Sequence, residues 1–133
     1  MRQFDMETIQ MINAFENITG TEVRDCVKGG DRMYFLVNAG KAALAIGKGG
    51  QRVQTAERQF GCPIKVVEFD ETIEKFIKNM IPCAEKIDIK GKKISVSING
   101  KSRGSIIGKE GCNIKTLREI LCRNSDFEDL RVL

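Results

Sequence analysis

The sequence predicts an α+β protein made of two copies of one small unit, and two observations support this prediction. A Gly-x-x-Gly turn at residues 47–50 recurs at residues 108–111, and the segments around the two turns align without a gap. The predicted order of elements is also the same around both turns: helix, strand, strand, helix, turn, helix and strand. Because internal repetition usually reflects two copies of one structural unit, these observations indicate a duplicated fold.

The first unit is predicted to span residues 1–70. Asp5 can cap its first helix, Gly20 suits the end of that helix, and the apolar stripe of the helix contains Phe4, Met11, Phe15 and Ile18. The segment 33–37 is apolar on both faces, as expected of a central strand. The expected helices cover residues 6–18, 41–46 and 51–60, and the expected strands cover residues 21–27, 33–37 and 64–69.

The second unit is predicted to span residues 71–133, and almost no linker separates it from the first. Its first helix is expected from Glu71 to Met80 with Asp70 as the cap, and Pro82 ends it because the residue before a proline avoids the helical region. The other expected elements are strands over 86–90, 94–98 and 130–133, a short helix from about residue 103 to the second turn, and a helix after that turn that buries Ile114, Leu117 and Leu121.

Net charge, histidine and cysteine content, and the length of apolar runs limit the functions that the sequence predicts. The 133 residues include 22 Lys and Arg and 18 Asp and Glu, and the resulting net charge of +4 lies in residues 71–133, which is compatible with a polyanionic partner. Histidine is absent, and the five cysteines form no Cys-x-x-Cys pair, so we expect no metal site, no cofactor and reduced thiols in the cytoplasm. No apolar run approaches membrane-spanning length, so no membrane contact is expected.

Both turns have the chemistry of a phosphate site. Glycine has no Cβ, so its backbone can approach a ligand closely and adopt positive φ at little steric cost. Each turn leads into a helix whose first N–H groups attract anions, and Lys48 or Lys109 adds a positive charge. The alternative is a tight turn between helices with a solvated lysine. Neither turn fits a nucleotide-binding motif, because a P-loop needs Ser or Thr after its lysine and a dinucleotide fingerprint needs a third glycine.

A small α+β unit whose helices are joined by Gly-x-x-Gly resembles a KH domain, and the helix and strand in front resemble the type II arrangement. The two copies, with their turns in residues 45–50 and 106–111, resemble the archaeal NusA-type family of transcription termination and antitermination factors, as do residues 21–26 and 68–69. The resemblance implies two tandem type II KH domains, residues 1–70 and 71–133. Each would be a three-stranded sheet covered by helices on one face.

The resemblance also implies binding of single-stranded RNA, with each turn clamping about four backbone nucleotides. Apolar residues beside the turns would contact bases or, alternatively, belong to the core: Ile46, Val53 and Ala56 in the first copy, and Ile107, Ile114 and Leu117 in the second. Glu110 departs from the pattern, and its carboxylate is expected to weaken the second clamp. The predicted RNA-binding residues are Ile46, Gly47, Lys48, Gly49, Gly50, Arg52, Val53, Ile107, Gly108, Lys109, Glu110, Gly111, Ile114 and Lys115.

The sequence therefore predicts a non-catalytic RNA-binding protein of transcription, and three alternatives stay open. One is a KH-type factor of ribosome assembly or RNA processing, and another is a protein–protein adaptor. The third, a nucleotide-binding enzyme, is disfavoured by the missing histidine and nucleotide motifs. RNA polymerase or another part of the transcription complex is a further candidate partner. The resemblance does not carry over direct polymerase contact, because the 133 residues leave no room for the polymerase-binding domain of bacterial NusA.

Overall fold

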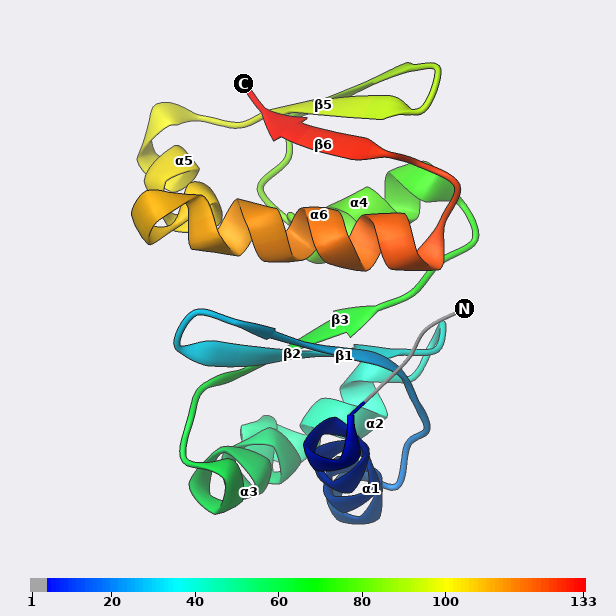
Figure 1. Cartoon of the computed structure of the whole chain (residues 1–133), viewed down its shortest axis with the longest axis vertical. Coiled ribbons are helices and arrows are strands. Elements are labelled where there is room, and N and C mark those ends of the chain that lie inside the picture. The colour runs from blue at the N-terminus through cyan, green and yellow to red at the C-terminus, as the bar shows by residue number, and fades with distance from the viewer. Residues whose placement is uncertain (1–4) are drawn as a thin grey trace. The chain divides into compact units, whose positions relative to one another are not determined.

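The computed structural model describes residues 5–133, which form two compact units (Figure 1). The first unit ends at Asp70 and the second begins at Glu71. Phe4, expected in the apolar stripe of the first helix, lies outside the described residues. Each unit contains one three-stranded sheet, so the α+β class is confirmed.

The first unit is built around its middle strand. Its elements are α1 (Met6–Thr19), β1 (Val23–Gly29), β2 (Arg32–Val37), α2 (Ala42–Ile46), α3 (Gln51–Phe60) and β3 (Ile64–Glu68). The sheet order is β1-β2-β3, with β1 antiparallel and β3 parallel to β2. All five residues from 33 to 37 are buried, which confirms the predicted central strand. Figure 1 shows α1, α2 and α3 on one face of this sheet.

Local capping signals set the ends of the helices in the first unit. The Asp5 carboxylate accepts a hydrogen bond from the Thr8 amide at 2.7 Å, so Asp5 is the predicted cap of α1. Gly20 and Gly61 end α1 and α3 in the left-handed conformation, with φ of 71° and 74°. Between helices and sheet, the ring of Phe15 stacks on that of Phe35 with centroids 4.0 Å apart.

The second unit repeats this topology. Its elements are α4 (Ile73–Met80), β4 (Lys86–Lys90), β5 (Lys93–Ser97), α5 (Gly100–Ile107), α6 (Cys112–Asn124) and β6 (Asp129–Val132). The sheet order is β4-β5-β6, again with an antiparallel pair followed by a parallel one. Figure 1 shows α4, α5 and α6 on one face of this sheet. Ile114, Leu117 and Leu121 of α6 are buried, as predicted.

Two helix starts in the second unit differ from the prediction. The first helix starts at Ile73 with Thr72 at the cap position, not at Glu71 with Asp70 as its cap. The Thr72 side chain makes no capping hydrogen bond, and the helix begins at Ile73, where the apolar stripe begins. The helix before the second turn starts at Gly100, earlier than expected, because the Asn99 side chain accepts a hydrogen bond from the Ser102 amide at 2.9 Å.

Among residues 5–133, no helix has the length and apolar character needed to cross a membrane.

Candidate nucleic-acid interface

The two Gly-x-x-Gly turns have the same backbone geometry. Gly47 (φ 79°, ψ 172°) and Gly108 (φ 76°, ψ 175°) occupy a region of φ and ψ that is essentially restricted to glycine. Gly50 and Gly111 are left-handed, with φ of 77° and 76°. In each turn the last glycine donates its N–H to the carbonyl of the first glycine at 3.1 Å, Gly50 to Gly47 and Gly111 to Gly108. The chain thus reverses between two helices within four residues, as the glycine pattern predicts.

The two turns differ in the residue at their third position. Gly49 and Glu110 both have left-handed backbones, with φ of 64° and 56°. Glu110 is the single non-glycine residue with positive φ in residues 5–133. The left-handed region costs an L-residue about 1 kcal/mol or more. The second turn therefore carries both backbone strain and a negative charge at a position where the first turn has neither.

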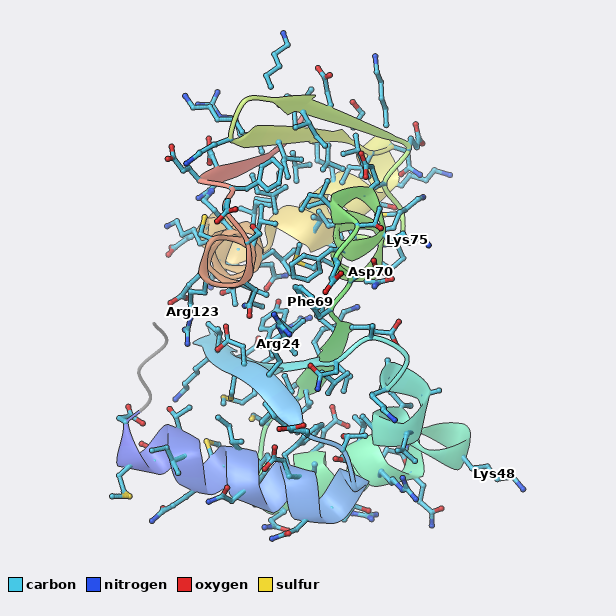
Figure 2. The ribbon with its side chains drawn as sticks, turned by 90° about the vertical axis from the view of Figure 1, so that its right-hand side faces the viewer. Arg24, Lys48, Phe69, Asp70, Lys75 and Arg123 are labelled. Carbon is cyan, nitrogen blue, oxygen red and sulfur yellow. The ribbon has the colours of Figure 1, made fainter. Side chains whose placement is uncertain are left out.

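The lysine of each turn is available to a ligand. Lys48 and Lys109 are both exposed. Figure 2 shows the Lys48 side chain extending from the turn, away from the rest of the first unit. In the second unit, the exposed side chain of Lys115 adds another cation. This side chain lies close to the turn, since a Cβ built on Gly111 would be 3.8 Å from the Cε atom of Lys115. Each turn therefore presents positive charge, and its first and fourth residues are glycines that add no side chain beside the backbone.

Arg52 is exposed, but its guanidinium group is hydrogen-bonded within the first unit. Its Nη1 atom donates to the carbonyl of Leu44 and to the carbonyl of Thr19, both at 2.9 Å. In the second unit, Asn113 occupies the matching position, and its Nδ2 atom donates to the Ser105 carbonyl at 2.9 Å. Each residue thus links the helix after the turn to the helix before it. A hydrogen bond of this kind contributes about 1 kcal/mol.

The same two side chains explain why the first glycine of each turn has no substitute. A Cβ built on Gly47 would lie 2.8 Å from Cγ of Arg52, and one built on Gly108 would lie 2.7 Å from Cγ of Asn113. Carbon atoms do not approach this closely without a shift. The first glycine is therefore required for its φ angle and also for the space that the side chain of the following helix fills.

Helix α2 is held at its other end by a carboxylate. Glu68, the last residue of β3, accepts a hydrogen bond from the Ala42 amide through Oε1 at 3.1 Å. A carboxylate at a helix start satisfies an amide that has no partner within the helix and suits the positive end of the dipole. The helix that leads into the first turn is thus fixed at both ends by side chains from other elements.

The apolar residues near the turns divide into exposed and core positions. Leu44 and Ile46 are 44% and 39% exposed, and Val53 and Ile107 are half-buried. Ala56, Ile114 and Leu117 are at most 8% exposed and belong to the core, which was the alternative interpretation of these positions. Leu44 was absent from the predicted set. In the second unit its counterpart is Ser105, so the first turn has the larger exposed apolar surface beside it.

Within the described part of the chain, no group of three or more Cys, Asp or Glu side chains is placed to hold a metal ion.

No protein-family model matches the sequence. The chain is 32% identical over 133 residues to the probable transcription termination protein NusA of Methanocaldococcus jannaschii, a match that covers 96% of this chain and 73% of the relative. It is 30% identical over 131 residues to the protein of the same name from Halobacterium salinarum, covering 95% of this chain and 94% of the relative. Among solved structures, the crystal structure of APE1850 matches with a TM-score of 0.75 and 27% identity, over 98% of this chain and 100% of the other.

Proposed function

This chain belongs to the archaeal family of NusA-type proteins, and we propose on that premise that it is a non-catalytic protein of transcription that binds single-stranded RNA at its two Gly-x-x-Gly turns. The relatives are named as probable transcription termination proteins, so we place the role in termination or antitermination. Residues 1–70 and 71–133 are proposed to be two tandem type II KH domains. Their shared topology, an antiparallel pair extended by a parallel third strand, supports this assignment.

The observation that carries the proposal is the turn geometry, which is repeated in full although the side chains around it differ. Both turns keep the same φ and ψ values, the same internal hydrogen bond and an exposed lysine, while Arg52 is replaced by Asn113 and Gly49 by Glu110. A requirement of packing alone does not explain an exposed lysine in both copies. A phosphodiester backbone lying against the turn uses the glycines, the helix start and the lysine together.

Residues of different chemistry at the turns contact different parts of the RNA. The turns 47–50 and 108–111 lie against the sugar–phosphate backbone, and Lys48, Lys109 and Lys115 neutralise phosphates. At the first turn, the exposed side chains of Leu44 and Ile46 supply an apolar surface for bases. The chain contains 6% aromatic residues and no Trp, so we expect bases to be held mainly by aliphatic contact and hydrogen bonds. The proposed partners are single-stranded RNA and, through it, the transcription complex, with RNA polymerase as a further candidate.

The first test is a fluorescence anisotropy titration with single-stranded and duplex RNA over a range of salt concentrations. We expect single-stranded RNA to bind more tightly, because the turns need an unpaired strand whose backbone and bases are both accessible. The slope of log K against log salt should be about −0.7 for each phosphate contacted. One phosphate at each turn then gives a slope of about −1.4 or steeper. Affinity that does not change with salt, or a preference for duplex RNA, would contradict the proposal.

The lysines of the second sheet are the natural control for that slope. Lys86, Lys90, Lys92 and Lys93 are exposed on β4, β5 and the turn between them. If these lysines contact only solvent, replacing Lys90 and Lys93 by glutamine leaves the slope unchanged. If they also bind phosphates, the same variant makes the slope less steep by about 0.7 for each phosphate that it no longer neutralises.

The difference at the third turn position gives a second prediction. Glu110→Gly is expected to lower the Kd for single-stranded RNA about two- to fivefold at low salt, because a surface charge interaction of about 0.4–1 kcal/mol is removed. The gain should shrink at high salt. Stability should change by less than about 1 kcal/mol, because relief of the left-handed strain is offset by the greater freedom of glycine in the unfolded chain.

The reciprocal variant, Gly49→Glu, is the matched comparison and should weaken binding. Replacing Lys109 by Asp should weaken binding less than disrupting the first turn does, since Glu110 already discourages phosphate there. Tighter binding by Gly49→Glu, or no change with Glu110→Gly, would show that the charge at this position does not face the RNA.

A further inference from the structure

Arg52 and Asn113 hold matching places in the two units, two residues after the second glycine of each turn. Each sends its side chain back across the turn to a carbonyl of the preceding helix, Leu44 in α2 or Ser105 in α5. Leu44 and Ser105 are themselves matching residues. We call Arg52 and Asn113 the turn tethers. The interaction is thus repeated at the same backbone positions, although a cationic side chain makes it in one unit and a neutral one in the other.

The carbonyls that the tethers reach lie at helix ends. Leu44 is in the last turn of α2, and Thr19 is the last residue of α1. The final carbonyls of a helix have no amide partner within it and form the negative end of its dipole. The guanidinium group of Arg52 therefore acts as a shared C-terminal cap for two helices.

The end of α1 is a fixed support for this contact. The Thr19 hydroxyl group donates to the Phe15 carbonyl at 2.8 Å and lies 2.8 Å from the hydroxyl group of Thr21. Thr19, Thr21 and Phe15 are all at most 5% exposed. Arg52 thus connects the start of α3 to a rigid, buried part of the first unit, and through Leu44 it fixes the distance between the two helices that the turn joins.

We propose that the turn tethers are positioning residues, which hold each Gly-x-x-Gly turn in the shape that receives RNA and do not themselves bind it. The identity of the ligand as RNA rests on the proposed function, whereas the positioning of the turn can be measured without a ligand. The first tether joins three helices and the second joins two, so the first turn is the better ordered in advance. Because ordering a loop on binding costs affinity, the first turn is also the stronger clamp.

The competing explanation is that Arg52 contacts a phosphate directly through its second terminal nitrogen, Nη2. The two explanations predict different results for Arg52→Asn, which places the tether of the second unit in the first. Asparagine can make the Leu44 contact, as Asn113 does with Ser105 on the same backbone geometry. It carries no charge, however, so it cannot replace a phosphate contact.

The experiment compares the unmodified chain with Arg52→Ala, Arg52→Asn and Asn113→Ala by two measurements. The first is amide hydrogen exchange of residues 47–50 and 108–111 without RNA, in which the turn of the unaltered unit is an internal reference. The second is RNA affinity as a function of salt. We expect Arg52→Ala to speed exchange at 47–50 alone and to raise the Kd about fivefold. Arg52→Asn should restore both to within about twofold, with the salt slope unchanged in every variant.

Two results would overturn the inference. If Arg52→Asn binds as weakly as Arg52→Ala and both make the salt slope less steep by about 0.7, Arg52 is a phosphate contact. If neither alanine variant speeds exchange at its own turn, the tethers do not position the turns. Should Arg52→Ala destabilise the whole first unit, Arg52→Asn and Asn113→Ala still decide the question. A failure of the unmodified chain to bind RNA would overturn the proposed function, while the exchange measurement would still test the tether.

Discussion

Replacing Lys48 and Gly49 together by aspartate is expected to raise the Kd for single-stranded RNA by about 10- to 100-fold. The change reverses one charge and adds another beside the proposed phosphate, and the loss of a charge-assisted hydrogen bond costs about 1.5–3 kcal/mol, where 1.4 kcal/mol corresponds to tenfold in Kd. The fold should persist. Lys48 is exposed, a Cβ at Gly49 meets no atom within 4 Å, and aspartate tolerates the left-handed φ of 64° better than most residues.

A matched control for this variant exists in the same unit. Lys28→Asp with Gly61→Asp makes the same two changes of residue type, since Lys28 is exposed and Gly61 is an exposed left-handed glycine (φ 74°) with open space around it. Gly61 ends α3, the helix that begins at the turn, so the substitution lies at the opposite end of that helix. Circular dichroism melting checks the fold of both variants. If the control weakens RNA binding as much as the turn variant does, net charge and not the turn governs affinity.

Much of the fold could be predicted because its boundaries depend on local chemistry. Asp5, Gly20 and Gly61 act within one helical turn of their own positions, so their roles follow from residue type and spacing. The start of α4 was predicted too early because Asp70 was taken as its cap, whereas the cap position falls at Thr72, whose side chain makes no capping hydrogen bond, and the apolar stripe begins at Ile73. The start of α5 was placed too late because the hydrogen bond of Asn99 extends the helix over glycine and polar residues.

The backbone of the site could be predicted more fully than its side chains. The glycines specify the turn, and the alignment of Gly49 with Glu110 identifies the strained residue of the second copy. Arg52 could not be identified as a tether, because it and Asn113 differ in type and their partners are carbonyls, which every residue has. The Glu68 contact to Ala42 joins residues far apart in the sequence, so the sequence gives no sign of it either.

A single-stranded RNA long enough to occupy both turns is expected to bind about 100-fold more tightly than an RNA that fills only one. β3 ends at Glu68 and α4 begins at Ile73, so only a few residues connect the units. Once one turn holds the strand, the short connection keeps the other turn at a high effective concentration near the remaining nucleotides. Titrating a series of oligonucleotides from about four nucleotides upward should reveal a step in affinity at the length that reaches the second turn.

Variants of the turns separate this effect from the simple statistical gain of a longer strand. A longer RNA offers more binding positions to any single site, and affinity then rises smoothly with length. The step should vanish in Lys48→Asp with Gly49→Asp and also in Lys109→Asp, while the smooth rise remains in both. Inserting a flexible Gly/Ser segment after Asp70 should make the step smaller, because effective concentration falls as a linker grows beyond the length it must span. A step that survives the loss of either turn would mean that the two turns do not bind one strand together.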